Sequence, residues 1–418
     1  MPNRLTLWII IGLVFGIASG YIAYAYFPDS SARYAEIASL LPTIFLRLIK
    51  MIIAPLVFST LVVGIAKLGD IAMVGKVGGK ALAWFMGASV ISLTLGLILV
   101  QLFEPGKAMQ LPLPEANAAS GLQTEALSLN TFIAHTVPTS VIDAMARNEI
   151  LQIVVFSLFF GTAMAALGER SKNVIEVFDT VAHIMLKVTG YVMLFAPLAV
   201  FGALASTVAK EGLGILGVYG LFVSEFYLGL AILWLVLVVL GGVVIGPRVV
   251  QLVRRIREPV ILAFSTASSE AAYPKTLEEL ERFGCSNRVA SFVLPVGYSF
   301  NLDGSMMYCT FAVMFIAQVY GIELSIGQQI VMVAILMLTS KGIAGVPRAS
   351  LVVIAATLPH FNIPEAGMLL LLGIDHFLDM GRSATNVVGN SIATAVVSKW
   401  QGELQAPSVE PLPAHRVT

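Results

Sequence analysis

The sequence contains few charged residues and no excess of either sign. Only 12% of its 418 residues are Asp, Glu, Lys or Arg, and the formal net charge is zero, whereas an average soluble domain has about 25% charged residues. A nucleic-acid-binding surface needs a local excess of Lys and Arg, so this composition argues against a nucleic-acid partner. With 57% hydrophobic residues and a mean hydropathy of +0.88, the chain has the composition of a polytopic membrane protein.

Cysteines and enzyme motifs are equally scarce. The two cysteines, Cys285 and Cys309, lie in or beside apolar stretches and near no pair of histidines, so we expect neither a disulfide framework nor a metal cofactor site. The sequence also lacks an H-E-x-x-H zinc motif, a G-x-S-x-G nucleophile motif and paired catalytic aspartates. We therefore expect a protein that is not an enzyme and that carries no cofactor.

Long apolar runs occupy the first 250 residues. The first run begins after Arg4 and continues to Ala25, which is longer than the apolar core of a signal peptide, so we predict a retained membrane span. Each run is about the 20 residues that a helix needs to cross the hydrocarbon core. The predicted spans are 5–27, 40–66, 80–103, 149–168, 184–208 and 215–246.

The loops between these spans differ in their content of Lys and Arg. The loops 28–39 and 209–214 hold few cations, whereas the loops after the second, fourth and sixth spans hold several. Cytoplasmic loops carry the excess of cations, so both termini are predicted to be cytoplasmic. The cations concerned are Lys67, Lys76, Lys80, Arg170, Lys172, Arg248, Arg254, Arg255 and Arg257.

After Arg257 the apolar pattern is interrupted by polar and glycine-rich stretches. A polar group or unwound backbone at membrane depth is tolerated only inside protein or beside a wet cavity. Two interrupted hairpins, each followed by a span, indicate the inverted repeat of a secondary transporter. The prediction is an all-α polytopic membrane protein with eight transmembrane helices and two re-entrant helical hairpins: hairpin 259–284 broken at 265–270, span 288–320 broken at 301–304, hairpin 328–358 broken at 340–347, and span 365–400.

The polar residues of these breaks match an anionic substrate and a cation. Helix N-termini at hairpin tips favour a carboxylate. Asp375, Asp379, Arg382 and Asn386 are spaced by 4, 3 and 4 residues and share one helix face. Arg382 could bind a carboxylate in a bidentate manner and Asp379 an ammonium group. Asp303 offers a hard oxygen ligand for a small cation.

Plainer interpretations remain open for each motif. Asp379 and Arg382 could form an intramembrane ion pair that only stabilises the bundle. Residues 301–304 could be an ordinary turn, and the small residues at 342–347 could serve close helix packing.

The four polar stretches at 265–270, 301–305, 340–347 and 375–386 resemble those of the glutamate/aspartate:cation symporter family, and the resemblance covers residues 5–402. It implies a homotrimer in the lipid of a prokaryotic inner membrane, working by an elevator mechanism. The implied units are 1–79, with scaffold helices 1 and 2; 80–148, with the third span, which belongs to the transport domain, and an external loop; 149–247, with scaffold helices 4 and 5 and transport-domain helix 6; 248–402, the transport core; and 403–418, a disordered cytoplasmic tail.

The same resemblance assigns roles to residues. Asp379 is implied to bind the substrate amino group and Arg382 its side-chain carboxylate. The remaining implied substrate contacts are Ser268, Ser269, Ser305, Gly345, Val346, Ser383 and Asn386. The implied cation-binding residues are Gly297, Asn301, Asp303, Asn386 and Asn390, with Na+ placed at Asp303 and Asn301.

Substrate class follows from two of these residues. Relatives that carry plain dicarboxylates tend to lack the acid at Asp379, and those that carry neutral amino acids tend to lack the base at Arg382. This chain has both, so aspartate and glutamate are favoured over succinate or serine. Ser383 replaces the more usual threonine, which affects fine selectivity.

The coupling ion is predicted to be a proton, with sodium as the alternative. Sodium-coupled relatives commonly have an aspartate at the position of Asn390 and a hydroxyl near that of Ala88, and losing both weakens the expected sodium sites. Animal relatives carry a protonatable glutamate at the position of Cys309. Glu270 resembles the acid of proton-coupled members, and burial can bring a carboxyl pKa near neutrality. Relatives commonly carry an arginine either at the first hairpin tip or in the last span. In this chain those two places hold Ala267 and Met380, and Arg348 beside the second hairpin tip is the candidate substitute.

Functions of other classes explain the sequence less well. An ion channel needs a continuous polar pore, whereas here the polar groups are placed in hairpins that can close over a ligand. A receptor or scaffold does not require charges at bilayer depth.

Overall fold

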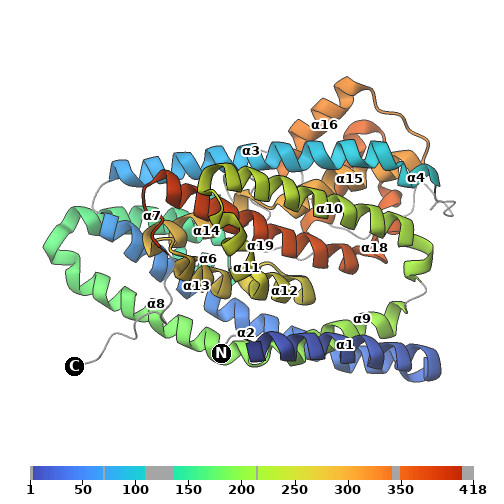
Figure 1. Cartoon of the computed structure of the whole chain (residues 1–418), viewed down its shortest axis with the longest axis horizontal. Helices are drawn as coiled ribbons and strands as arrows, with labels where there is room; N and C mark the ends of the chain where they lie inside the picture. The colour runs from blue at the N-terminus through green and yellow to red at the C-terminus, as the bar shows by residue number, and fades with distance from the viewer. Residues whose placement is uncertain are drawn as a thin grey trace.

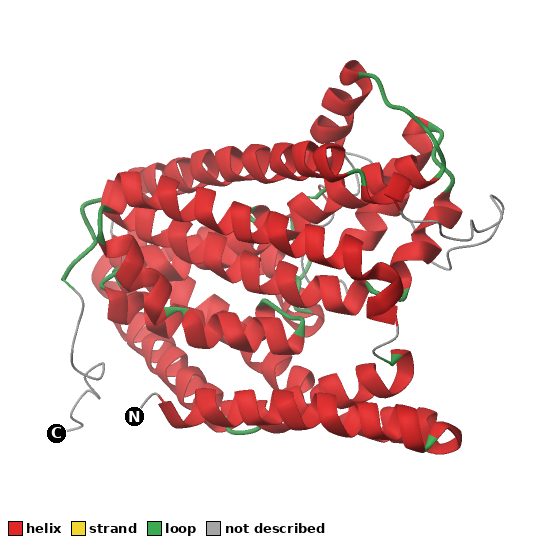
Figure 2. Ribbon diagram, turned by 45° about the vertical axis from the view of Figure 1, so that its right-hand side comes forward, coloured by secondary structure: helices red, strands yellow, loops and turns green. Residues whose placement is uncertain are grey.

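The computed structural model describes residues 3–68, 71–108, 133, 136–212, 215–340 and 349–406. Within these ranges the chain is helical apart from short connections and one isolated antiparallel bridge between Cys285 and Leu404 (Figure 2). The helices of the first half are α1 (Asn3–Tyr26), α2 (Pro28–Leu68), α3 (Ile71–Phe103), α4 (Pro105–Ala108), α6 (Val141–Arg147), α7 (Ile150–Leu167), η1 (Gly168–Ser171), α8 (Lys172–Met193), α9 (Ala196–Glu211) and α10 (Ile215–Ile245).

The second half is divided into shorter helices. They are α11 (Arg248–Arg255), α12 (Arg257–Thr266), η2 (Glu270–Ala272), α13 (Tyr273–Phe283), α14 (Asn287–Phe300), α15 (Asp303–Val319), α16 (Ile326–Thr339), α17 (Ala349–Thr357), η3 (Leu358–Phe361), η4 (Glu365–Met368), α18 (Leu369–Leu372) and α19 (Asp375–Trp400).

Six helical stretches of the described chain are long and apolar enough to cross a membrane. This confirms the expected class of polytopic, all-helical membrane protein; the count of eight spans, the re-entrant path of the hairpins and the inverted repeat stay predictions. The six stretches are Leu7–Tyr26, Pro28–Ala66, Gly75–Lys107, Ile150–Met193, Tyr219–Ile245 and Asn287–Val319.

Three predicted boundaries were wrong. The expected loop 28–39 is the start of α2, because Pro28 is tolerated in a first helical turn. The expected span 184–208 is divided between α8 and α9 by a turn at Leu194 and Phe195, just before Pro197 in the first turn of α9. The expected span 365–400 begins only at Asp375, after two short helices.

The predicted breaks are present wherever the structure describes them. Helix α12 ends at Thr266, and Ala267 adopts the left-handed conformation (φ 49°) that commonly terminates a helix. Helix α14 ends at Phe300 and α15 starts at Asp303. The predicted second break falls between α16 and α17, and residues 341–348 lie outside the described residues.

The helices pack in two groups. In the first group, α1 lies along α9, and α2 packs against α9, α7 and α8. In the second, α3 packs on α15, while α19 contacts α10, α12, α14 and α15 (Figure 1). Helix α14 also contacts α2 and joins the two groups. The polar faces of α15 and α19 therefore meet inside the second group.

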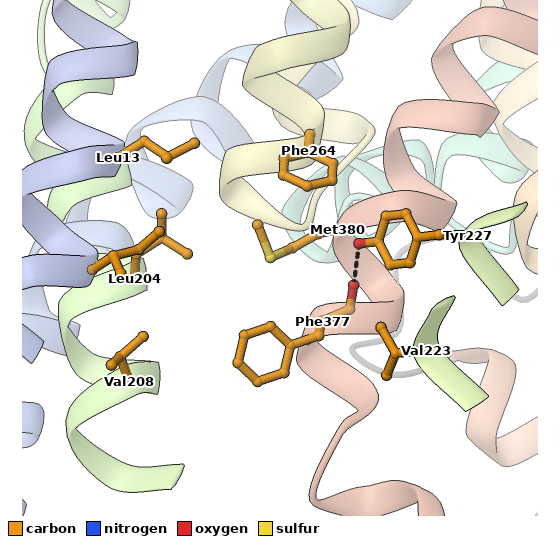
Figure 3. Close-up of a pocket in the computed structure, with 9 residues that line it drawn as sticks. Leu13, Leu204, Val208, Val223, Tyr227, Phe264, Phe377 and Met380 are labelled. Atoms are coloured by element: carbon orange, nitrogen blue, oxygen red, sulfur yellow. Dashed lines mark hydrogen bonds between the residues drawn. The ribbon is translucent and has the colours of Figure 1, made fainter. Parts of the chain in front are cut away.

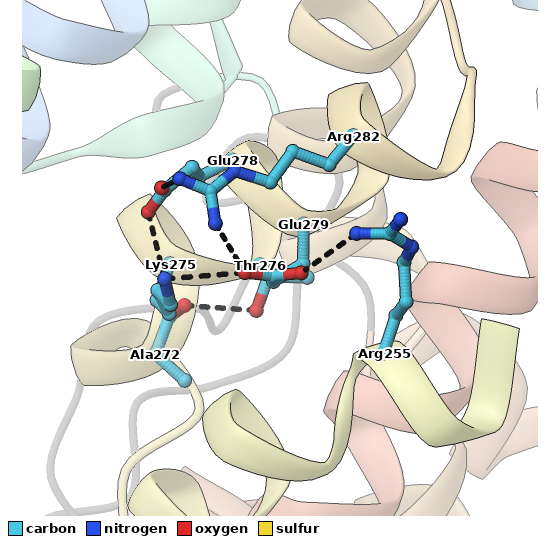
Figure 4. Close-up of polar contacts among 7 residues, drawn as sticks. All are labelled: Arg255, Ala272, Lys275, Thr276, Glu278, Glu279 and Arg282. Atoms are coloured by element: carbon cyan, nitrogen blue, oxygen red, sulfur yellow. Dashed lines mark hydrogen bonds and ion pairs between the residues drawn. The ribbon is translucent and has the colours of Figure 1, made fainter. Parts of the chain in front are cut away.

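An ion-pair network covers the charged face of α13 (Figure 4). Lys275 Nζ lies 2.9 Å from Glu278 Oε2 and 3.2 Å from Glu279 Oε1. Arg282 pairs with both glutamates, and Arg255 of α11 reaches Glu279 at 3.8 Å. Both glutamates are therefore paired with more than one cation, which lets this charged face be partly buried.

The end of α19 is fastened to neighbouring helices. Arg248 Nη2 donates to the carbonyl oxygens of Phe283 and Gln405, and the Gln405 N–H donates to Gly284 O at 2.8 Å. Gly284 has φ +111°, and a Cβ there would lie 2.3 Å from Gln405 O. Lys80 Nζ donates to Trp400 O at 2.6 Å. These contacts fix the end of α19 against α3, α11 and α13.

Close packing of α1 on α9 requires glycine at every fourth residue. A Cβ on Gly12, Gly16 or Gly20 would lie 2.4, 2.6 and 2.7 Å from backbone oxygens of α9. Such small-residue faces let membrane helices approach closely.

We predict that Gly16→Ala lowers the thermal unfolding temperature of the purified protein. The new methyl group collides with backbone rather than a movable side chain, and overpacking of this kind costs about 1–3 kcal/mol. Gly87→Ala in α3 is the matched control, because its Cβ meets nothing within 4 Å. An equal unfolding temperature for Gly16→Ala and wild type would contradict the packing of α1 on α9.

Candidate functional site

A buried polar cluster surrounds Asp303 at the break between α14 and α15. Asp303 has no solvent exposure. Its Oδ1 accepts from Ser92 Oγ of α3 at 3.1 Å, and its Oδ2 accepts from Asn301 Nδ2 at 2.9 Å. Asn301 Nδ2 also lies 3.4 Å from Asn390 Oδ1 of α19. Residues from three distant parts of the chain therefore meet around one carboxylate.

Asn386 ties α19 to the first turn of α15. Its Oδ1 accepts from the backbone N–H groups of Gly304 at 2.9 Å and Ser305 at 3.4 Å, and its Nδ2 donates to Ser305 Oγ at 3.1 Å. The N–H groups of a first helical turn have no partner within the helix. Asn386 thus satisfies the start of α15 and fixes the Asp303 cluster beside α19.

Two glycines make room for this cluster. A Cβ on Gly389 would lie 1.9 Å from Asp303 Oδ2, and one on Gly297 would lie 2.2 Å from Asn390 Oδ1. Both contacts are far below the approach of real atoms, so no larger residue fits without displacing the polar side chains. Gly297 therefore leaves room for the Asn390 side chain, while its predicted role in cation binding stays a prediction.

The side chains around Asp303 are oxygen ligands of the kind that hard cations prefer. Together with Asp303 they offer one carboxylate, one hydroxyl and two amide oxygens. Asn301 Oδ1 is buried and has no hydrogen-bond partner among the described residues, so this oxygen is available as a ligand.

A second cluster surrounds Arg382 on the same helix. Its Nη2 lies 3.0 Å from Asp375 Oδ1 and 2.9 Å from Asp379 Oδ1. Its Cζ lies 4.1 Å from the centre of the Tyr308 ring of α15, a cation–π arrangement. Arg382 and Asp375 are buried, whereas the Asp379 side chain is 31% exposed. The ion pair left open by the sequence is present, and it includes Asp375 as well.

The guanidinium of Arg382 has spare hydrogen-bonding capacity. Its Nε and Nη1 atoms are buried and have no hydrogen-bond partner among the described residues. Buried N–H donors are almost always paired. A carboxylate bound to Nη2 could reach Nε on one edge of the guanidinium or Nη1 on the other, so the cluster can accept a further anionic group.

Helix α10 holds α19 on both sides of this cluster. Tyr227 Oη donates to Phe377 O at 2.6 Å, and Trp234 Nε1 donates to Thr385 Oγ1 at 2.7 Å. A Cβ on Gly381 would lie 2.7 Å from the Leu230 side chain and 3.1 Å from the Tyr227 ring. The stretch of α19 that carries Asp379 and Arg382 is therefore fixed at both ends.

The serines of the first hairpin lie at the end of a helix that packs on α19. Ser268 Oγ accepts from the Ala271 N–H at 3.2 Å and stabilises the turn, and Ser269 precedes η2. Helix α12 contacts α19. Glu270 lies elsewhere, in a small apolar cavity formed with Val57 of α2, Ile150 of α7 and Tyr298 of α14.

The other predicted residues are distributed as follows. Ser383 is buried on α19, and Met380 lines an apolar cavity. Gly345, Val346 and Arg348 lie outside the described residues.

Sequence reasoning missed the contributions of Ser92 and Tyr308 and gave Asp375 no role of its own. Ser92 lies one helical turn after Ala88, to whose carbonyl its hydroxyl donates. The hydroxyl expected to be lost at Ala88 is therefore available from Ser92. The only sequence signal for Ser92 was a serine inside an apolar span, which is weak. The signal for Asp375 was stronger, because this residue shares a helix face with Arg382.

Comparison with known proteins gives one consistent result. The sodium:dicarboxylate symporter family matches residues 5–400. A proton/sodium-glutamate symport protein of Geobacillus stearothermophilus is 41% identical over 404 residues, covering 94% of each chain. A C4-dicarboxylate transport protein of Bacillus subtilis (strain 168) is 38% identical over 413 residues, covering 98% of this chain and 96% of the relative.

We predict that Asp375→Asn destabilises the protein more than Asp379→Asn. Both carboxylates contact the same Nη2 atom, but Asp375 is buried and Asp379 is partly exposed. Removing one partner of a buried ion pair costs about 3–5 kcal/mol, whereas exposed pairs contribute about 0–1 kcal/mol. Thermal unfolding of the two variants checks this, and an equal or opposite order would contradict the assignment of Asp375 as the structural partner.

Proposed function

Because the chain belongs to the sodium:dicarboxylate symporter family, we propose that it takes up aspartate or glutamate together with a cation across a bacterial inner membrane, with both termini in the cytoplasm. The family consists of symporters rather than enzymes. The observation that carries the substrate class is the buried Arg382, whose donor atoms Nε and Nη1 are both unused among the described residues, beside a partly exposed Asp379.

Substrate binding exchanges partners around Arg382. The side-chain carboxylate of the substrate replaces Asp379 on Nη2 and gains a second bond from Nε or Nη1. Asp379, released from Arg382, accepts the substrate ammonium group. Asp375 stays on the guanidinium throughout, so no charge is left buried without a partner. Ser383 and Asn386 of α19 and Ser305 of α15 supply the remaining polar contacts.

Cation binding is placed at Asp303, with oxygens from Asn301 and Asn390. The two sites share α15 and α19: a Cβ on Gly304 would lie 2.6 Å from Arg382 O, and Asn386 bonds to the first turn of α15. A cation that fixes this turn also fixes the helix that carries Tyr308 and faces Arg382. Each ligand thereby raises the affinity for the other, and this linkage is reciprocal.

The hairpins and the assembly complete the proposal. Ser268, Ser269, Gly345 and Val346 form the cradle for the substrate main-chain carboxylate, and Arg348 adds positive charge beside it. Packing of the described helices in two groups supports a transport unit that moves against a scaffold in an elevator manner within a homotrimer. A proton is the favoured coupling ion, carried by Glu270; sodium at Asp303 is the alternative.

C4-dicarboxylate uptake is the second candidate. Its support is the name of relatives such as the Bacillus subtilis protein. The two candidates differ at Asp379, because a dicarboxylate has no ammonium group to bind there.

We predict uptake of radiolabelled aspartate into proteoliposomes when a cation gradient is imposed. Proton and sodium gradients are applied separately, because the first tests Glu270 and the second tests the Asp303 cluster. Gly389→Ala should abolish uptake by displacing Asp303, whereas Gly87→Ala should retain it. Absence of aspartate uptake under both gradients would reject acidic amino-acid symport.

We also predict that two variants of the Arg382 cluster change substrate preference differently. Arg382→Ala should abolish aspartate uptake, because it removes the carboxylate ligand. Asp379→Asn should weaken aspartate uptake more than succinate uptake, by roughly tenfold for each 1.4 kcal/mol of lost ammonium binding. Competition of each substrate against labelled aspartate measures this. Equal loss for both substrates would remove the ammonium role from Asp379.

A further inference from the structure

An apolar cavity separates the two helix groups at the level of the Arg382 cluster. Its volume is about 280 Å³. On one side lie Leu13 of α1 and Leu204 of α9, and on the other lie Phe264 of α12 and Phe377 and Met380 of α19 (Figure 3). Ile17 of α1 also lines the cavity. Phe377 and Met380 flank Asp379 in sequence but line this cavity, so it is distinct from the polar clusters.

The described lining offers almost no polar partner for water or a polar solute. Its one hydroxyl among the described residues belongs to Tyr227, and it donates to the backbone oxygen of Phe377 at 2.6 Å. A buried water needs two to four polar partners, and an apolar cavity of about 150 Å³ stays dry and binds benzene. The described lining of this cavity lacks such polar partners, so it suits a hydrocarbon ligand.

The walls of the cavity continue into the apolar outer surface. On α1, the lining residues Leu13 and Ile17 adjoin Ile10 and Val14, which are 44% and 56% exposed. On α10, Tyr227 adjoins Leu228, which is 52% exposed. Both helices belong to predicted membrane spans, where exposed apolar side chains face lipid. The hydrocarbon nearest to the cavity is therefore that of the bilayer.

We propose that this cavity binds the acyl chain of a membrane lipid. The chain enters between the lipid-facing stripes of α1 and α10 and fills the space between α9 and α19. It packs against Phe264 at the end of the first hairpin helix and against Met380 beside Asp379. Binding here does not depend on the proposed transport function.

The test uses the full-length protein in phosphatidylcholine and phosphatidylglycerol vesicles with a trace of phosphatidylcholine that carries a photoreactive diazirine in one acyl chain. After irradiation, mass spectrometry locates the cross-links. We expect cross-links on Phe264, Phe377 and Met380, which lie on the inner wall, in addition to those on the outer surface. Cross-links confined to outer residues such as Val14 and Leu228 would overturn the proposal.

Two filling variants provide the control for position. Val223→Trp and Leu13→Trp place an indole in the cavity from half-buried positions on α10 and α1. Each should reduce inner-wall cross-linking by roughly tenfold, equivalent to about 1.4 kcal/mol of binding. Leu228→Trp, on the lipid face of α10, should leave it unchanged. Wild-type levels of inner-wall cross-linking in both filling variants would overturn the proposal, and the result stands whether or not aspartate is transported.

Discussion

The buried positive charge of Arg382 is the constraint on which the rest of the second helix group depends. A guanidinium inside a membrane protein is stable only with paired charges and satisfied donors. Asp375 and Asp379 supply the charge, and the Tyr308 ring covers one face. Both carboxylates contact Nη2, and the donor atoms Nε and Nη1 have no partner among the described residues. The ion pair is therefore complete in charge but not in hydrogen bonds, which is why the proposed substrate site is centred on Arg382.

Two polar clusters share one pair of helices, which gives coupling a physical basis. Asp303 begins α15 and Tyr308 follows on the same helix, while Arg382 and Asn386 lie on α19. The polar side chains reach one another because Gly389 adds no atoms to the interface. The Asp303 cluster and the Arg382 cluster therefore depend on the same relative position of α15 and α19.

The boundary between the helix groups has the opposite chemistry. Near α1 and α9 the second group presents Phe264, Phe377 and Met380 rather than polar residues. This part of the boundary is made of apolar side chains, which form no directional hydrogen bonds with one another. It therefore differs from the polar contacts of Asp303 and Arg382 inside the second group.

Hydropathy, chain interruptions and helical spacing are local properties, so the membrane class, the helix breaks at Ala267 and at Asn301, and the shared face of Asp379 and Arg382 could be predicted from the residues. The start of α19 was misplaced, since apolar residues before Asp375 do not reveal a change of direction. The contact of Ser92 with Asp303, 211 residues away in the chain, and the apolar cavity lined by Phe377 and Met380 become visible only in the folded chain. Such contacts depend on how helices pack, and helix packing is set by side chains distant in sequence.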